Sequence, residues 1–347
     1  MQDYWSRQHG KDCRCGCNFN NWLALVPDGK KVVNVIGGFL GAGKTTLVNH
    51  MLSQPLDRRI DVIVKEFGAI PVDSKLLNIE KDRIHAFTGA SLHIDQQTML
   101  TSFIEALYGN VTKHPFDHLL IEASGAESAE QIAQIFYLPR SRDHYELGSF
   151  ITVVDAEFGR LNLAEFRIAR EQTALADFLV LNKCDCVDEA ELNALKHELR
   201  IINPFAEIIE TSFGKVDAAH VIAPDSFEQL RSIDFNRQEG ESVENFKSIA
   251  LRIAEPLDME KVNAWIRETY AEYGKKLLRG KGYFNIAGSD YRFDFQSVRT
   301  NFHAKTEDEW NPDETRESVV VFIGAELPDK ELLKAGLKAC AASKQER

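Results

Sequence analysis

A glycine-rich segment that ends in Lys-Thr-Thr carries the clearest chemical signature in this sequence. Residues 38–46 read GFLGAGKTT, which fits the pattern G-x-x-x-x-G-K-[ST] in full. A strand-like apolar run at 31–37 precedes it, and a helical pattern at 46–52 follows it. Glycines let successive backbone N–H groups converge on an anion, and the helix N-terminus adds its positive dipole end. We therefore predict a site for the phosphates of a nucleoside triphosphate rather than a glycine-rich turn that happens to precede a helix.

The residues of this segment have different expected tasks. Lys44 is expected to reach the β- and γ-phosphates and to act in catalysis, and the Thr45 hydroxyl is expected to ligate Mg²⁺. The expected nucleotide-binding residues here are Gly38, Gly41, Ala42, Gly43, Lys44, Thr45 and Thr46.

A second motif predicts which base is bound. Residues 182–185 read Asn-Lys-Cys-Asp and follow a short apolar run at 177–181. N-K-x-D at a strand end is the guanine-reading loop of GTPases. The Asp185 carboxylate would accept hydrogen bonds from guanine, while the stem of Lys183 covers the base and Asn182 completes the loop. Because adenine offers no matching pair of donors, the sequence favours GTP over ATP.

Two acidic residues at predicted strand ends complete the expected site. Glu122 closes an apolar strand at 118–122 and precedes Ala-Ser-Gly. P-loop enzymes place a second Mg²⁺-directed carboxylate and a γ-phosphate-sensing loop at such a position. We predict that Glu122 binds Mg²⁺ and acts in catalysis, the alternative being an ordinary surface glutamate. Glu66, in the Glu-Phe-Gly of 66–68, is a less specific switch residue to which we also assign a catalytic role.

The order of apolar runs predicts an α/β fold: a P-loop NTPase domain with a mainly parallel sheet, followed by a small α+β domain. Six strands are expected in the first domain, and a long helix at 258–278 and an antiparallel sheet in the second. The expected units are a cysteine-containing arm at 1–30, a GTPase domain at 31–226, a linker at 227–245 and a C-terminal domain at 246–347.

Composition and charge narrow the function classes. The 347-residue chain has a formal net charge of −12, which argues against general nucleic-acid binding and against an anionic membrane surface as partner. It shows neither a signal peptide nor an apolar run long enough to span a membrane, so a cytoplasmic location is expected. Its six cysteines then suggest metal or redox chemistry rather than a disulfide scaffold.

Taken together, the motifs resemble those of the CobW family of GTPases over about residues 31–337. The resemblance implies a cytoplasmic, metal-linked GTPase that delivers metal to, or activates, a client metalloenzyme or cofactor pathway. It rests on residues 38–46, 66–68, 122–125, 154–156 and 182–185 and on the C-terminal segments 276–282, 295–298 and 321–324.

One departure from that family concerns metal. Its members typically carry Asn-Gly-Cys-x-Cys-Cys after the third strand, and those thiols form an internal metal site. This chain has Thr-Gly-Ala-Ser-Leu-His at 88–93, and Val64 where the family often has an acidic residue. His93 is the one side chain of the segment that could still ligate, and a capping or packing role suits it better. We therefore expect the usual internal metal site to be absent.

The N-terminal arm offers a replacement for that site. Cys13, Cys15 and Cys17 alternate, so they share one side of an extended chain. Thiolates suit a soft transition metal, which we leave open among zinc, nickel, cobalt and copper. His9, a partner molecule or a second copy of the arm could supply a fourth ligand. The alternative is a tail whose cysteines bind nothing.

The leading function is a GTP-hydrolysing metallochaperone, with GTP and Mg²⁺ as cofactors and a client metalloprotein or cofactor-assembly enzyme as partner. Hydrolysis should be slow without a partner, because neither switch segment contains an arginine that could neutralise the transition state. The alternative is a GTP-gated assembly or activation chaperone that carries no metal. A metabolic enzyme using GTP as phosphoryl donor ranks third, since no acceptor-substrate motif is evident. A nucleotide-dependent homodimer is a further arrangement left open.

Overall fold

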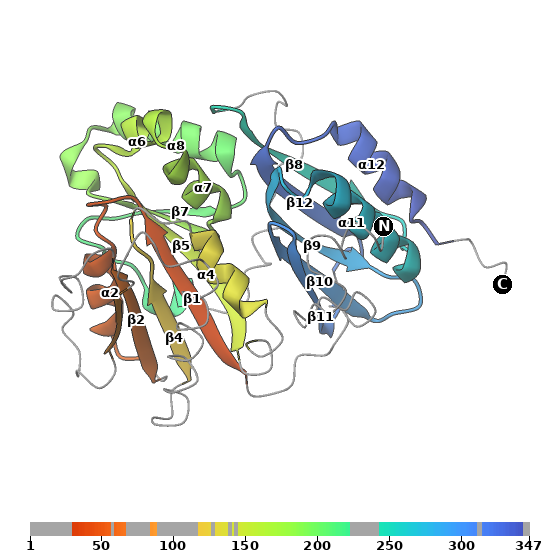
Figure 1. Cartoon of the computed structure of the whole chain (residues 1–347), viewed down its shortest axis with the longest axis horizontal. Helices are drawn as coiled ribbons and strands as arrows, with labels where there is room; N and C mark the ends of the chain where they lie inside the picture. The colour runs from red at the N-terminus through yellow and green to blue at the C-terminus, as the bar shows by residue number, and fades with distance from the viewer. Residues whose placement is uncertain are drawn as a thin grey trace.

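The computed structural model describes most of two domains. The described residues are 30–56, 59–66, 84–88, 117–125, 129–137, 141, 145–222, 243–310 and 314–342. Figure 1 shows one sheet in each domain, with helices packed on both. Among the described helices, none is both long and apolar enough to cross a membrane.

The first domain is built on a parallel sheet of seven strands. They lie in the order β3-β2-β4-β1-β5-β6-β7, and neighbouring strands pair in parallel throughout. Because parallel strands end at the same edge, the loops that follow them meet there. The strands are β1 (Lys31–Gly38), β2 (Ile60–Glu66), β3 (Ile84–Thr88), β4 (His118–Glu122), β5 (Tyr145–Asp155), β6 (Phe178–Asn182) and β7 (Glu207–Glu210).

Helices bury both faces of this sheet. Val33 and Val35 of β1 belong to one apolar cluster with Ile132 of α4, whereas Ile36 belongs to another with Leu47 of α2. This division follows from the alternation of side chains along a strand, and it explains why the central strands are apolar at nearly every position. The helices are α2 (Lys44–Leu52), α4 (Ala129–Phe136), α6 (Gly159–Glu165), α7 (Arg167–Leu175), α8 (Glu189–Ile202) and α9 (Ala218–Ile222), with a 3₁₀ turn at Cys184–Cys186.

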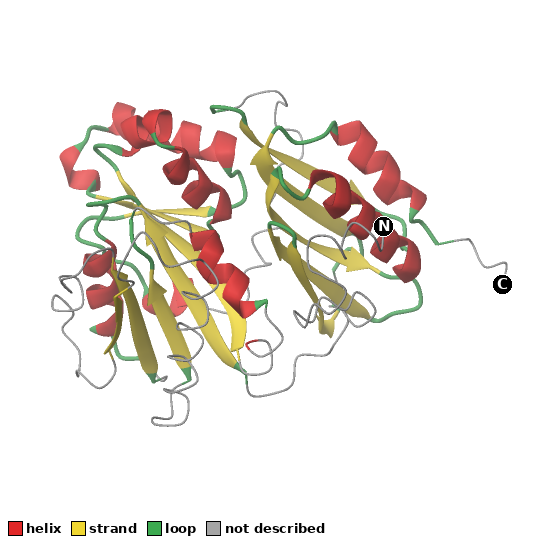
Figure 2. Cartoon of the chain, viewed as in Figure 1, coloured by secondary structure: helices red, strands yellow, loops and turns green. Residues whose placement is uncertain are grey.

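The second domain is an antiparallel sheet of five strands in the order β11-β10-β9-β12-β8. Helices α11 (Met259–Tyr273) and α12 (Lys330–Ala339) cover one face, where Trp265 and Leu337 pack with Phe322. Figure 2 shows these two helices lying together along the sheet. The strands are β8 (Phe246–Ile253), β9 (Leu277–Asn285), β10 (Tyr291–Val298), β11 (Asn301–Glu309) and β12 (Ser318–Ala325).

The other face of the second sheet packs against the first domain. Leu278 and Val321 share one apolar cluster with Leu192 and Leu199 of α8. The two domains therefore share a hydrophobic core, which holds them together far more firmly than a flexible linker would.

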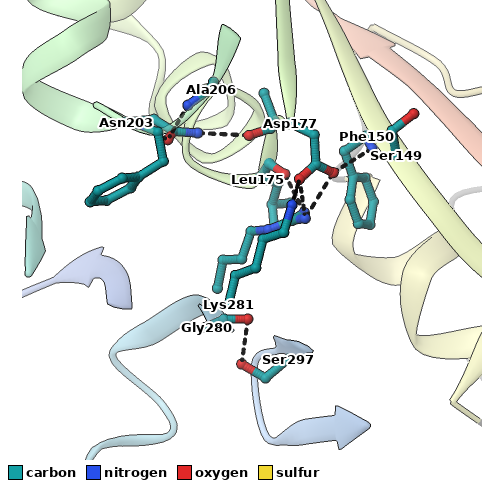
Figure 3. A network of polar contacts seen from close by, with 12 residues as sticks. Ser149, Phe150, Leu175, Asp177, Asn203, Ala206, Gly280, Lys281 and Ser297 are labelled. Carbon is teal, nitrogen blue, oxygen red and sulfur yellow. Dashed lines mark hydrogen bonds and ion pairs between the residues drawn. The ribbon is translucent and has the colours of Figure 1, made fainter. Parts of the chain in front are cut away.

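A buried ion cluster lies within this interface (Figure 3). The Asp177 carboxylate, directly before β6, accepts hydrogen bonds from Arg279 at 2.7 and 2.8 Å and from Lys281 at 2.9 Å, both in β9. It also accepts one from the backbone N–H of Phe150 at 2.9 Å. Burial alone would raise the pKa of Asp177, but the charges of Arg279 and Lys281 outweigh it and hold that pKa below its ordinary value.

The predicted fold class is confirmed, and the strands expected at 118–122, 207–210 and 246–253 have those bounds. The helix expected at 258–278 was wrong at its end. It stops at Tyr273, and Leu277 already pairs with Gly324 in the sheet. Two leucines at 277–278 continue an apolar helical stripe equally well, so pairing with distant strands decided their conformation. Strands β3 and β11 and helices α6 and α7 were not predicted, and the helix expected at 92–107 lies outside the described residues.

Candidate nucleotide-binding site

The glycine-rich loop follows β1 and opens α2 with a backbone that only glycine adopts easily. Gly41 and Gly43 have φ of 75° and 102°, in the left-handed region. A side chain at Gly43 would also lie 2.3 Å from the Asn182 amide nitrogen. Helix α2 begins directly after this glycine, with Leu47 N–H donating to the Gly43 carbonyl at 3.0 Å. The loop can therefore aim its N–H groups at an anion from the start of the helix.

Lys44 and Thr45 lie at the first turn of α2, at the edge where the strands end. The Lys44 ammonium donates to the carbonyls of Gly38 at 3.1 Å and Phe39 at 3.3 Å, so it lies over the loop itself. The Thr45 hydroxyl donates to Glu122 at 2.7 Å. A hydroxyl and a carboxylate that is 2% exposed are hard oxygen donors, which suit Mg²⁺.

The segment after β4 packs directly on the glycine-rich loop. The Ala123 N–H donates to the Ile36 carbonyl at 2.9 Å, continuing the pairing of β4 with β1. A side chain at Gly125 would lie 2.7 Å from the backbone nitrogen of Leu40. Because the two backbones are this close, a shift of the glycine-rich loop on ligand binding would also displace residues 123–125.

The Asn-Lys-Cys-Asp loop is fixed to the glycine-rich loop by its asparagine. Asn182, which is 2% exposed, donates to the Ala42 carbonyl at 2.9 Å and accepts from the Gly214 N–H at 3.0 Å. Lys183 has a φ of 63° and pairs with Asp155 at 2.6 Å. Asp185 is exposed, and its own N–H donates to the Ser212 hydroxyl at 3.2 Å. These hydrogen bonds hold the backbone of the loop in place, while the Asp185 carboxylate is exposed.

Two parts of this site were not predicted from the sequence. The loop after β7 supports the Asn-Lys-Cys-Asp loop, since Thr211 accepts from the Cys184 N–H at 3.1 Å. A side chain at Gly214 would lie 2.8 Å from the backbone of Leu47. Asp155, at the end of β5, was noticed only as part of a family motif. The sequence signal that could have identified Asp155 is a polar residue at the end of a strand in a parallel sheet.

The predicted site residues differ in how far the structure describes them. Residues 38–46, Glu122 and residues 182–185 meet at one edge of the sheet. Glu66 ends β2 at the same edge, but its side chain is not described. His93 and the three arm cysteines, Cys13, Cys15 and Cys17, lie outside the described residues.

The thiols that are described are free and lie in different surroundings. Cys184 is half-buried and Cys186 is exposed, because the 3₁₀ turn that carries them lies at the surface. Burial raises the pKa of Cys184, and it raises that of the helix-end Cys340 to about 11. Within the described part of the chain, no three His, Cys, Asp or Glu side chains are grouped to hold a metal ion.

Comparisons with known proteins match both domains. A family model described as CobW/HypB/UreG, nucleotide-binding domain, matches residues 32–210, and the cobalamin synthesis protein cobW C-terminal domain matches residues 246–341. The zinc chaperone YjiA of Escherichia coli is 30% identical over 310 residues, covering 87% of this chain and 96% of that protein. The zinc chaperone CobW of Pseudomonas aeruginosa is 27% identical, covering 93% of each chain. The crystal structure of Zn(II)-bound YjiA GTPase from E. coli matches with a TM-score of 0.65, covering 90% of this chain and 100% of that one at 27% identity.

Proposed function

Because this chain belongs to the CobW/HypB/UreG family of nucleotide-binding proteins, we propose that it is a GTP-hydrolysing metallochaperone. The observation that carries the proposal is the hydrogen bond of Thr45 to Glu122 at 2.7 Å, at the edge of the sheet where Asn182 holds the base-reading loop. The family resemblance predicted from the motifs is confirmed by the two matching family models.

In the proposed reaction the protein mainly positions the nucleotide and neutralises its charge. Backbone N–H groups of the loop hold the phosphates, and Lys44 exchanges its loop carbonyls for the β- and γ-phosphate oxygens. Thr45 and Glu122 would hold Mg²⁺, which supplies positive charge to the phosphates when bound. Glu66 ends β2 next to β4 and is proposed as a second switch residue. Turnover is slow without a partner, since no arginine occurs in the segments 66–68 and 122–125.

Guanine is proposed to be read by the exposed carboxylate of Asp185. The bracing of Asn182 on Ala42 supports this role, because it fixes the base-reading loop relative to the phosphate-binding loop. A charge-assisted hydrogen bond is worth about 1.5–3 kcal/mol, so GTP should bind roughly tenfold to hundredfold more tightly than ATP.

The cargo is proposed to be a soft metal ion, with zinc the first to test because relatives are named zinc chaperones. Its proposed ligands are Cys13, Cys15 and Cys17. The partner is proposed to be a client metalloprotein in the cytoplasm. The family models leave residues 1–31 and 211–245 unmatched, which supports an arm and a linker near the boundaries predicted from the sequence.

Nucleotide titrations and metal analysis test this proposal. Wild-type protein should bind GTP at least tenfold more tightly than ATP, and Lys44→Ala should abolish hydrolysis. Protein purified under reducing conditions and loaded with Zn²⁺ should retain the metal after desalting. Equal affinities for GTP and ATP would refute guanine recognition. GTP binding without retained metal would favour the gating chaperone that carries no metal.

A further inference from the structure

We propose that Asp155 is a positioning residue that sets the guanine preference by holding the Lys183 side chain in place. This inference rests on the proposed function, because it assigns a role within the proposed base-reading loop. It adds a specificity determinant from β5, a strand that lies outside both nucleotide-binding motifs.

The two oxygens of the Asp155 carboxylate do different things. Oδ2 accepts a hydrogen bond from the Lys183 ammonium at 2.6 Å. Oδ1 accepts from the backbone N–H groups of Glu157 at 3.0 Å and Phe158 at 3.3 Å. The backbone of the turn after β5 thus holds the Asp155 carboxylate in place through Oδ1, and the carboxylate in turn orients the Lys183 side chain through Oδ2.

Strand pairing places the Asp155 carboxylate level with the start of the base-reading loop. Asp155 is the last residue of β5 and lies opposite Asn182, the last residue of β6, in the parallel register. The Ala156 N–H donates to the Asn182 carbonyl at 2.8 Å, so the two strand ends remain paired beyond this point. Lys183, the next residue, therefore starts within reach of Asp155 because of the sheet itself.

Lys183 needs such an anchor to cover a base. A lysine side chain has a flexible four-carbon stem, and its backbone here has a φ of 63°, which costs energy for a residue with a Cβ. Asp155 is 5% exposed, whereas the Lys183 side chain is 36% exposed. A buried, hydrogen-bonded carboxylate thus ties down the end of a half-exposed stem. An ordered stem loses less conformational freedom when a base stacks on it, and guanine nucleotides gain from this because Asp185 is proposed to hold guanine, and not adenine, in this loop.

Asp155→Asn separates the two tasks of this carboxylate. The amide oxygen can still accept from the Glu157 and Phe158 N–H groups, while the amide NH₂ faces the Lys183 ammonium, placing a donor against a donor. We expect the affinity for GDP to fall about tenfold, the loss of one charge-assisted hydrogen bond, with weak ADP binding unchanged. Asp258→Asn is the matched control, because Asp258 likewise accepts from two backbone N–H groups, at the start of α11 in the other domain. It should leave GDP affinity unchanged.

A double-mutant cycle tests whether Asp155 acts through Lys183. Lys183→Met keeps the stem and removes the ammonium. If the role is positioning, the double variant Asp155→Asn/Lys183→Met should bind GDP no more weakly than Lys183→Met alone. Additive losses, or an equal loss of ADP affinity, would overturn the proposal. Asp155→Glu retains the negative charge and should lose less GDP affinity than Asp155→Asn, which keeps the test decisive if the asparagine variant folds poorly.

Asp185→Asn distinguishes failure of this inference from failure of the proposed function. If Asp185→Asn weakens GDP binding and Asp155→Asn does not, the base-reading loop stands and the role of Asp155 is refuted. If neither substitution changes GDP affinity, guanine reading by this loop is itself refuted, and the role of Asp155 with it.

Discussion

The Asp177 carboxylate and the Arg279 guanidinium, 102 residues apart in the chain, form a two-pronged ion pair at 2.7 and 2.8 Å across the domain interface. Asp177 directly precedes β6, and the opposite end of that short strand carries Asn182. Arg279 lies in β9, the middle strand of the second sheet. The C-terminal domain therefore holds the start of the strand that positions the base-reading loop.

Breaking this pair should destabilise the protein strongly. Asp177→Ala would leave Arg279 and Lys281 buried without their shared carboxylate, a change that costs about 3–5 kcal/mol in other proteins. Urea unfolding at pH 7 measures the free energy of unfolding. Asp290→Ala is the control, since Asp290 pairs with Arg316 at the surface and should contribute about 1 kcal/mol or less. Equal losses for the two variants would contradict the interpretation.

The lowered pKa of Asp177 predicts that the free energy of unfolding depends on pH. The pKa of Asp177 is held below 3.8 in the folded protein, so its stabilisation is fully present above that pH and is lost as the pH falls through the lower folded-state pKa. The difference in unfolding free energy between wild type and Asp177→Asn should be constant at pH 5–7 and shrink below about pH 4. Urea titrations at several pH values measure it. A difference that grows on acidification would show that the pKa is raised instead.

Gly43→Ala should disrupt the nucleotide site. The new Cβ would meet the Asn182 amide at 2.3 Å, which displaces the brace between the two nucleotide loops. We expect GDP affinity to fall by more than about tenfold, the equivalent of one lost hydrogen bond to a buried group. Gly288→Ala is the control, because Gly288 also has a positive φ of 78° but open space around its Cβ position. It should cost about 1 kcal/mol in stability and leave GDP affinity unchanged.

Glu122→Gln should raise the Mg²⁺ concentration needed for half-maximal GTP hydrolysis. Glu122 accepts from Thr45 and is proposed to bind the ion with it, so its loss should lower Mg²⁺ affinity by at least the roughly tenfold to hundredfold that follows the loss of a residue supporting a metal ligand. Thr45→Ala should act on the same step, so the two losses should not add. Turnover is followed by phosphate release across a Mg²⁺ titration. Glu198→Gln, which alters the surface partner of Arg160, should leave the titration unchanged.

Replacing Cys13, Cys15 and Cys17 with serine should lower retained zinc sharply and leave GTP affinity unchanged. Three thiolates bind a soft ion only when deprotonated, so zinc affinity of the wild type should also fall as the pH is lowered. Metal content after desalting and GTP titration of the same preparations measure both effects. His93→Ala is the comparison variant. Loss of zinc in His93→Ala with full retention in the triple variant would place the metal site elsewhere.

The sequence by itself determined the nucleotide motifs and the class of the fold. Residues 38–46 and 182–185 are short continuous segments, each directly after an apolar strand, so their chemistry follows from local pattern. The end of the long helix shows the limit of such patterns. Leu277 and Leu278 fit a helical stripe and a buried strand equally well, and the pairing of Leu277 with Gly324 of β12 made them the start of β9.

Only the tertiary structure decided which side chains support those motifs. Asp155 and Lys183 are separated by 28 positions, and Asp177 and Arg279 by 102. Each pair exists because the order of strands in a sheet, or the packing of one sheet on another domain, brings the two side chains together. A lone aspartate at a strand end gives no signal of its partner in the sequence, since an ion pair depends on distance in space and leaves no periodic pattern along the chain.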